Sequence, residues 1–509
     1  MGLLSFFGRR RTRWDHSIPI IRLAAGDAVS LDDLYSGVQA WGSTGSGKTS
    51  GSMAALCRGL FSSGAGALCL CAKRDDRALY ERYARECGRQ NDVMVFGPDS
   101  SPLRYNFVAA SLNADGSSGG PGLVTNLTAL LMTLSEIGAG GGGKGGGVRE
   151  DEGYFRRAAE QLCRNSLQPL VLAARVGGVG GVGGVGGNSG SLTIPDLHKF
   201  VSSLPTTIEE EASPSWRDRS YCFQTLRAAD KAPMTQSERL DFELAVSVIL
   251  GEWAAMADRT KSSILSTLTS TLDLLSRGTC RDLLSSPTTN VSPEMCWEGA
   301  IVIVDLPVLV YHDIARTVAV ILKFCWQRAA MRRDLSRGDR PMAIIADESH
   351  LFAASPDWEF QAVARASNTA TIYSTQSLSN YLEVFGEHSE ARVHALLANL
   401  QCQIFHQCTD VRTIKYAQDL IGMRRTLLFN GNSNGQGNDL GLLLGVRDPG
   451  TSAGFSEQYL PELQARDLNG LRKGGRVNKG IVDAILYQGG KTFRATGRTW
   501  TPVSFRQTG

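Results

Sequence analysis

The residues with the clearest chemistry lie in one short segment near the N-terminus, Gly42–Thr49. It reads GSTGSGKT and meets the pattern G-x-x-x-x-G-K-[ST]. A mostly apolar stretch, Val38–Trp41, precedes it, and a helix-compatible run, Ser50–Leu60, follows it. Backbone N–H groups of such a loop surround phosphate oxygens, and the following helix points the positive end of its dipole at the anion. The sequence therefore predicts a nucleotide phosphate site.

Two residues of this phosphate loop have separate roles. Lys48 is expected to reach the β- and γ-phosphates, and the Thr49 hydroxyl is expected to bind Mg²⁺. The residues expected to contact ATP are Gly42, Ser43, Thr44, Gly45, Ser46, Gly47, Lys48, Thr49 and Ser50. A ligand-free turn rich in Gly and Ser would fit the same pattern, but the flanking strand and helix signals favour the phosphate site.

A second motif supplies the acidic groups that such a site needs. The apolar stretch Met342–Ala346 predicts a strand, and it ends in Asp347 and Glu348. We expect Asp347 to hold Mg²⁺ through water and Glu348 to act as general base on the attacking water. An acidic cap on a buried strand is the alternative. Together with the phosphate loop, the pair favours an ATPase over a small-molecule kinase, which needs no such glutamate.

Three further residues lie close to this motif in the sequence. Gln376 ends the stretch Thr371–Gln376, which reads as a strand, and an amide at this position can sense the γ-phosphate. Arg365 lies on the helix before that strand; in ring ATPases an arginine there reaches the neighbour's nucleotide, and a solvated helix arginine is the alternative. His350 has no partner at metal-ligand spacing and is interpreted as structural.

The segments around these candidate site residues alternate in sequence between strand patterns and helix patterns. Gly66–Ala72 and Asp92–Gly97 read as buried strands around a helix at Asp76–Gly88. This alternation predicts an α/β fold with a parallel sheet covered on both faces. Near the C-terminus, Asn430–Asn438 predicts a loop, and Gln488-Gly489-Gly490 predicts a hairpin.

An all-helical insertion interrupts the α/β pattern. Helical periodicity without strands extends over residues 123–255, and two glycine tracts, Gly138–Gly147 and Gly177–Gly190, predict mobile loops. We predict a basic N-terminal tail at 1–17, a nucleotide-binding domain in two parts at 18–122 and 256–509, and the helical insertion between them at 123–255.

Composition restricts the class of protein only loosely. The 509 residues are 42% hydrophobic and 20% charged, which is ordinary for a soluble globular protein. A net charge of +3 argues neither for nor against nucleic acid. The 11 cysteines lack zinc-ligand spacing and favour reduced thiols in a cytoplasmic protein.

The N-terminus raises the question of membrane contact. No run of 18 apolar residues predicts a transmembrane helix. Within residues 1–13 a short apolar patch lies beside four arginines, which is compatible with peripheral contact at the inner membrane. A solvated terminus is the other interpretation.

These blocks resemble the type IV secretion coupling proteins, the TraD/TraG class of conjugative DNA-transfer ATPases. The most specific part is Ser374–Ser379, which follows the Asp347-Glu348 strand. Other matching blocks are Gly42–Thr49, Phe96–Pro98, Arg104–Phe107, Arg259–Ser263, Gly386, Asn399, Phe405, Asp410, Thr413 and Gly422. The chain departs from the family in having Phe107 instead of proline and in lacking the usual N-terminal membrane helices. Residues 126–254 also carry 12 Lys+Arg against 15 Asp+Glu, a net charge of −3 (12 − 15).

The resemblance implies a RecA-like P-loop domain with an inserted all-α domain, hexameric rings and ATP hydrolysis. It implies recruitment of relaxase-bound single-stranded DNA, or of protein effectors, to the type IV secretion machinery. It gives Arg365 the role of a finger that reaches the neighbouring subunit and Gln376 the role of a sensor. The alternatives are an FtsK/HerA-like DNA-pumping ATPase unrelated to secretion and a slow nucleotide-dependent cargo adaptor.

Overall fold

A single large sheet organises the nucleotide-binding part of the chain. The computed structural model describes residues 14–99, 102–113, 122–138, 150–177, 191–354, 356–386, 389–433 and 451–507. Over these residues nine strands form the sheet, in the order β13-β12-β9-β3-β8-β7-β4-β6-β5. Their bounds are β3 Val38–Trp41, β4 Gly66–Leu70, β5 Val93–Phe96, β6 Ile301–Val304, β7 Met342–Ala346, β8 Thr369–Thr375, β9 Cys402–Phe405, β12 Ile481–Gln488 and β13 Trp500–Arg506.

The strands from β9 to β5 pair in parallel, whereas β12 and β13 add antiparallel at one edge. Every residue of β3, β4, β6, β7, β8 and β9 is buried. This explains the continuous apolar sequences of β4, β6 and β7, because a parallel sheet is covered by helices on both faces. The α/β class predicted from the sequence is confirmed.

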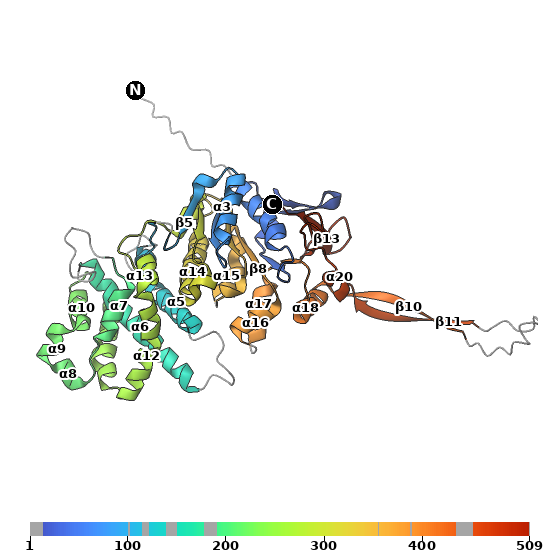
Figure 1. Cartoon of the computed structure of the whole chain (residues 1–509). Helices are drawn as coiled ribbons and strands as arrows, with labels where there is room; N and C mark the ends of the chain where they lie inside the picture. The colour runs from blue at the N-terminus through green and yellow to red at the C-terminus, as the bar shows by residue number, and fades with distance from the viewer. Residues whose placement is uncertain are drawn as a thin grey trace, which may run out of the picture.

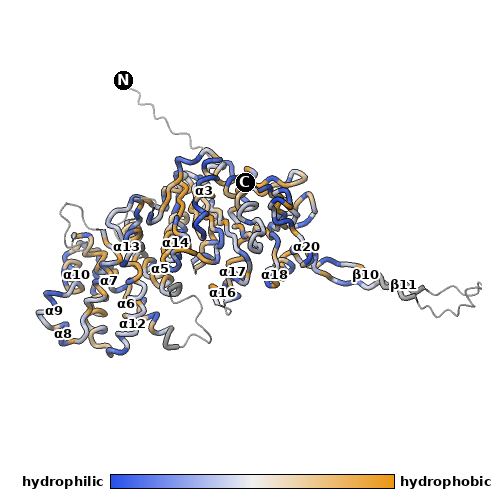
Figure 2. Tube along the Cα trace, viewed as in Figure 1, coloured by the Kyte–Doolittle hydropathy of each residue, from blue (hydrophilic) through white to orange (hydrophobic). Residues whose placement is uncertain are grey.

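Alternate residues of each strand supply the two apolar layers. On one face, Cys69 of β4 belongs to the core that holds α2 (Ala54–Ser62) and α3 (Asp76–Glu86). On the other face, Leu68 of β4 packs with residues of α14 (Val308–Arg332) and α15 (Pro356–Val363). Figure 2 shows the apolar segments gathered around the sheet and α14.

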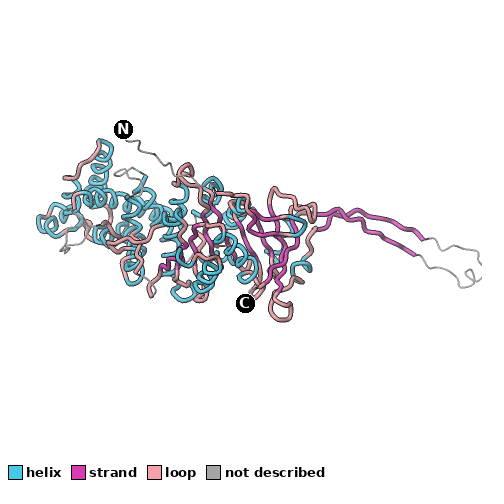
Figure 3. The backbone as a smooth tube through the Cα atoms, turned by 90° about the horizontal axis from the view of Figure 1, so that it is seen from above, coloured by secondary structure: helices cyan, strands magenta, loops and turns pink. Residues whose placement is uncertain are grey.

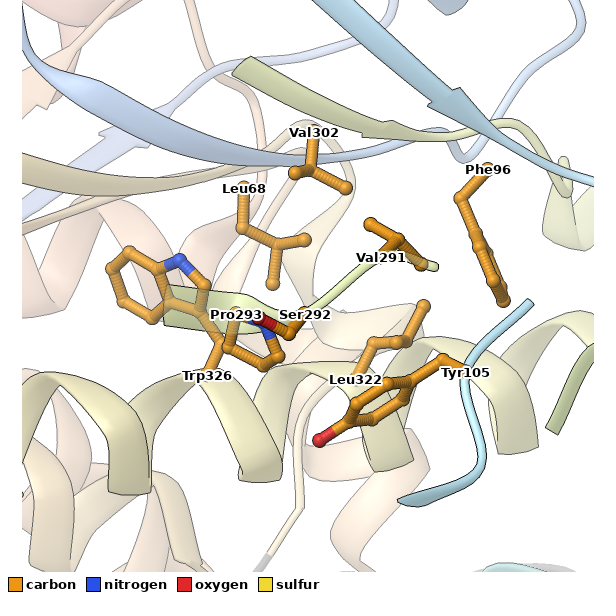
Figure 4. Close-up of a pocket in the computed structure, with 9 residues that line it drawn as sticks. All are labelled: Leu68, Phe96, Tyr105, Val291, Ser292, Pro293, Val302, Leu322 and Trp326. Atoms are coloured by element: carbon orange, nitrogen blue, oxygen red, sulfur yellow. The ribbon is translucent and has the colours of Figure 1, made fainter. Parts of the chain in front are cut away.

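A small apolar cavity separates the sheet from α14. Figure 4 shows Leu68 and Val302 on the strand side and Leu322 and Trp326 on the helix side. Phe96, Tyr105, Val291, Ser292 and Pro293 complete the lining. Since its lining offers almost no polar groups, the cavity is part of the packing between layers.

The helices after β5 form a separate body beside the sheet (Figure 1). They are α4 Phe107–Asn113, α5 Gly122–Gly138, α6 Glu150–Arg175, α7 Ile194–Ser202, α8 Ile208–Ala212, α9 Pro214–Arg219, α10 Tyr221–Asp230, α11 Gln236–Val246, η4 Ser247–Trp253, α12 Asp258–Leu275 and α13 Gly278–Leu284. Helix α12 packs on α6 and α7 although it follows the predicted boundary at residue 255.

The domain boundaries predicted after residues 17, 122 and 255 remain predictions. Residues 139–149 and 178–190, which make up most of both glycine tracts, lie outside the described residues, as does the segment 1–13.

Two smaller features accompany the sheet. Strands β1 Pro19–Arg22 and β2 Ala28–Ser30 pair with each other and lead into α1 Leu31–Leu34. Between β7 and β8 lie η6 Ser349–Leu351 and η7 Ala364–Ser367. Between β8 and β9 lie α16 Leu378–Phe385 and α17 Glu390–Ala398; α18 Val411–Ile421 follows β9, and α20 Ala465–Asn469 precedes β12.

A long antiparallel hairpin projects from the body of the molecule. It consists of β10 Met423–Ser433 and β11 Thr451–Pro461, and Figures 1 and 3 show it extending away from the sheet. The loop predicted at Asn430–Asn438 is therefore wrong for residues 430–433, which pair with β11; residues 434–438 lie outside the described part of the chain. Asn and Gly disfavour strands, and here the cross-strand pairing overrides that preference.

The hairpin predicted near Gln488-Gly489-Gly490 is confirmed. Strands β12 and β13 pair antiparallel, with Tyr487 opposite Trp500. The connection is longer than the Gln488-Gly489-Gly490 signal alone implies, because β13 begins only at Trp500.

Candidate nucleotide site

The candidate site lies where four neighbouring strands end. In the sheet, β3, β8, β7 and β4 are adjacent and parallel. The phosphate loop follows β3, Gln376 follows β8, Asp347 and Glu348 follow β7, and Lys73 comes soon after β4. Carboxyl ends of parallel strands meet at one edge, so the topology brings these segments together.

The phosphate loop depends on glycine at two positions. A Cβ at Gly42 would lie 2.5 Å from Ser46 Oγ and 2.8 Å from His406 Cβ. At Gly47, where φ is +90°, a Cβ would lie 2.5 Å from Val482 Cγ2. The loop therefore packs against His406, which follows β9, and against Val482 of β12. A side chain in place of Gly42 or Gly47 would displace the backbone of the loop.

Lys48 is folded back onto the loop. Its Nζ donates to the carbonyl of Gly42 at 2.6 Å, and the side chain is buried. Burial lowers the pKa of Lys48, and the charges of Glu348 and Asp347 oppose that shift. Ser46 Oγ is also buried and has no hydrogen-bond partner within the described structure. A buried ammonium and an unpaired hydroxyl on a glycine-rich loop fit the phosphates of a nucleotide.

The two predicted metal ligands are in direct contact. Thr49 Oγ1 donates to Asp347 Oδ2 at 2.7 Å, and Ser374 Oγ donates to Asp347 Oδ1, also at 2.7 Å. Burial raises the pKa of Asp347, but the charge of Lys73 and these hydrogen bonds outweigh burial and place the pKa below its usual value. An ionised carboxylate beside a threonine hydroxyl offers the oxygen ligands that Mg²⁺ prefers.

Glu348 adopts a backbone conformation that is uncommon for its residue type. Its φ of 48° and ψ of 46° lie in the left-handed region, and the residue is 5% exposed. Non-glycine residues in this region cost about 1–3 kcal/mol and gather at functional sites. Among the described residues Oε2 has no hydrogen-bond partner, whereas Oε1 accepts from two side chains. One buried carboxylate oxygen therefore has no hydrogen bond within the described structure.

Gln376 joins the phosphate loop to this glutamate. Its Nε2 donates to Glu348 Oε1 at 3.2 Å, and its Oε1 accepts from Thr44 Oγ1 at 3.2 Å. A side chain with these two contacts can respond to changes at either one. The sensor role stays a prediction.

His350, interpreted from the sequence as structural, lies beside the same carboxylate. Its Nδ1 is 2.8 Å from Thr375 Oγ1 and 3.8 Å from Glu348 Oε2. Burial lowers the pKa of His350, and Glu348 opposes that shift. A structural role fits these contacts, since the imidazole supports the turn that carries Glu348.

Arg365 does not reach the phosphate loop of its own chain. It lies in η7, before the first residue of β8, and therefore at the opposite edge of the sheet from Gln376. The side chain is 69% exposed, and its Nη2 lies 3.5 Å from Asp32 Oδ2. Contact with a neighbouring subunit's nucleotide stays a prediction.

Sequence reasoning missed three residues of the site. Lys73 contacts both catalytic-site carboxylates, Ser374 holds Asp347, and His406 lies beneath the phosphate loop with its Nε2 2.7 Å from Ser52 Oγ. Lys73 could have been found, because it comes soon after a buried strand just as Asp347 follows β7. No local pattern marks His406.

The fold and the site together define a P-loop nucleotide-binding domain of the RecA-like type that carries an all-α domain. Residues 341–468 match a family model described as the TraM recognition site of TraD and TraG. This segment contains Asp347, Glu348, Arg365 and Gln376, and the match confirms the resemblance to TraD/TraG-type coupling proteins.

Solved structures extend the likeness of fold to nearly the whole chain. The bacterial conjugative coupling protein TrwBdeltaN70 in an unbound form has a TM-score of 0.59 at 12% identity, covering 96% of this chain and 88% of that chain. TrwB with the ATP analogue ADPNP has a TM-score of 0.56 at 12% identity, with coverage of 98% and 91%. TrwB with ADP and Mg²⁺ has a TM-score of 0.55 at 9% identity, with coverage of 97% and 90%.

No curated protein sequence matches the chain. Among the helices of the described residues, none combines the length and apolar character that a bilayer span requires.

Proposed function

We propose that the chain is an ATP-hydrolysing motor of the conjugative coupling type. It works as a hexameric ring in the cytoplasm, at the inner membrane, and moves relaxase-bound single-stranded DNA or a protein substrate towards a type IV secretion channel. The observation that carries the proposal is the contact of Thr49 with Asp347 beside Glu348, within the fold of TrwB.

The residues of the site divide the work of hydrolysis. Lys48 and the loop amides bind the phosphates, and Thr49, together with Asp347 acting through water, would hold Mg²⁺. When bound, Mg²⁺ neutralises charge on the phosphates. Glu348 orients a water molecule and accepts its proton at Oε2, the carboxylate oxygen that has no other hydrogen bond in the described structure.

The arrangement supports turnover rather than nucleotide storage. A nucleotide-binding switch needs the phosphate loop and the metal ligands, but it has little use for a buried glutamate on a strained turn. Gln376 contacts both Glu348 and Thr44, which provides a route by which the state of the nucleotide could reach β8 and α16. A motor requires such a coupling between hydrolysis and movement.

The test is the steady-state ATPase rate of the full chain over a range of protein concentrations, with and without single- or double-stranded DNA. We expect cooperative dependence on protein concentration and stimulation by single-stranded DNA. Lys48→Ala, which removes the phosphate-binding ammonium, serves as the inactive control. Turnover that is indifferent to DNA would favour a protein substrate. The absence of ATP hydrolysis under all these conditions would contradict the proposal that the chain is a motor.

A further inference from the structure

Lys73 is a second lysine at the site, with no role in the mechanism above. Its Nζ lies 3.2 Å from Glu348 Oε1 and 3.7 Å from Asp347 Oδ2. Its side chain is 43% exposed, whereas both carboxylate side chains are almost fully buried. Lys73 is therefore a solvent-accessible cation that pairs with the proposed general base and with the proposed metal ligand.

The backbone of Lys73 is fixed while its side chain has room to move. The buried carboxylate of Asp76 accepts hydrogen bonds from the backbone N–H groups of Ala72 and Lys73, both at 2.8 Å. These bonds hold the turn between β4 and α3. A long, partly exposed side chain on a fixed backbone can exchange one anion for another without any movement of the sheet.

The charges in the site change sharply when a nucleotide binds. In the structure, the ammonium groups of Lys48 and Lys73 balance the carboxylates of Asp347 and Glu348. A Mg²⁺–ATP complex brings net negative charge, much of it on the γ-phosphate next to the metal. The metal ligand Asp347 lies within 3.7 Å of Lys73 Nζ, so the γ-phosphate would arrive close to this ammonium. A terminal phosphate carries more negative charge than a carboxylate and offers three acceptor oxygens to an ammonium.

Lys73 also occupies an oxygen of the proposed general base. Glu348 Oε1 accepts from both Lys73 and Gln376. If Lys73 moved to another anion, Gln376 would be the remaining described partner of this oxygen.

We propose that Lys73 recognises the γ-phosphate. Without nucleotide it pairs with Glu348, and when ATP binds it moves to the γ-phosphate and leaves Glu348 free to act on water. This inference rests on the proposed ATPase function, and it makes Lys73 a residue that distinguishes ATP from ADP.

The experiment compares the dissociation constants of ADPNP and ADP, each with Mg²⁺, by calorimetry in the absence of DNA. The variants are Lys73→Met, which keeps the length and removes the charge, and Lys73→Arg, which keeps the charge. Arg74→Met is the matched control, because Arg74 is an exposed cation next in the chain. In Lys73→Met we expect ADPNP to bind about 10- to 100-fold more weakly, the range for loss of a hydrogen bond to a charged group. ADP binding should stay unchanged, and Lys73→Arg should recover part of the loss.

The outcomes separate this inference from the proposed function. Equal weakening of ADPNP and ADP in Lys73→Met would mean that Lys73 only supports the fold of the site. An unchanged ratio of the two constants would also overturn γ-phosphate recognition, while leaving the ATPase proposal intact. If the unaltered chain bound neither nucleotide, both proposals would fail.

Discussion

The hydroxyl of Thr49 donates a 2.7 Å hydrogen bond to Asp347, although 298 residues separate them in the sequence. The two residues come from opposite halves of the nucleotide-binding domain, on either side of the helical body. Their contact brings the two predicted metal ligands together at one point of the site.

Thr49→Val should therefore remove the contribution of Mg²⁺ to nucleotide binding. Loss of a hydrogen bond or ligand contact to a charged group costs about 1.5–3 kcal/mol, or roughly 10- to 100-fold in affinity. The measurement is the dissociation constant of ADPNP with Mg²⁺ and with EDTA. Thr49→Ser keeps the hydroxyl and is the control. Equal Mg²⁺ dependence in Thr49→Val and the unaltered chain would remove Thr49 from the metal site.

Glu348→Gln should trap ATP. The amide keeps the shape of the side chain but cannot accept the proton of water, so hydrolysis should fall about 10²- to 10⁴-fold while binding persists. Single-turnover hydrolysis, together with chromatography of the bound nucleotide, measures both effects. We also expect the trapped ATP to stabilise the ring, which sedimentation can detect. A variant that hydrolyses ATP at the normal rate would show that Glu348 is not the base.

Arg365→Ala should abolish hydrolysis without weakening nucleotide binding. The exposed guanidinium lies at the opposite edge of the sheet from Gln376, so the predicted role in hydrolysis is at a neighbouring subunit's nucleotide. Mixing Arg365→Ala with Lys48→Ala tests this directly, because a mixed ring contains interfaces that pair an intact loop with an intact arginine. Recovery of ATPase activity on mixing is the expected result. No recovery at any ratio would count against the role in the neighbouring site.

His406 should make the folded chain sensitive to acid. Burial, reinforced by the charge of Lys48, lowers the pKa of His406 to about 3. Between pH 6.5 and 3 the unfolded chain binds a proton at this residue and the folded chain does not, so stability falls as the pH falls through this window. From pH 7 to pH 5 the loss is about 2 kcal/mol for a group with an ordinary pKa of about 6.5.

The measurement for His406 is the shift in melting temperature between pH 7 and pH 5. His406→Gln retains a hydrogen-bonding group for Ser52 but does not titrate, so its shift should be smaller than that of the unaltered chain. His394→Gln, at an imidazole whose side chain is 45% exposed, is the matched control. Identical shifts in all three proteins would show that His406 does not govern the response to acid.

Much of the fold could be predicted from the sequence because its signals are local. The phosphate loop is a contiguous pattern, and β3, β4 and β7 are short apolar runs that only a covered sheet can bury. The acidic pair after Met342–Ala346 and the amide of Gln376 were expected at strand ends, and the parallel order β3-β8-β7 brings them beside the loop.

Other features depend on pairing and packing between distant segments. The hairpin of β10 and β11 escaped prediction because its Gly- and Asn-containing residues form a strand only through their cross-strand partners. Lys73 and His406 gain their significance from neighbours that lie hundreds of residues away in the sequence, Glu348 in one case and Ser52 in the other. By itself the sequence determined which residue types could bind phosphate and Mg²⁺. Only the tertiary structure decided which other side chains meet them, because strand order in a sheet is set by packing over the whole domain.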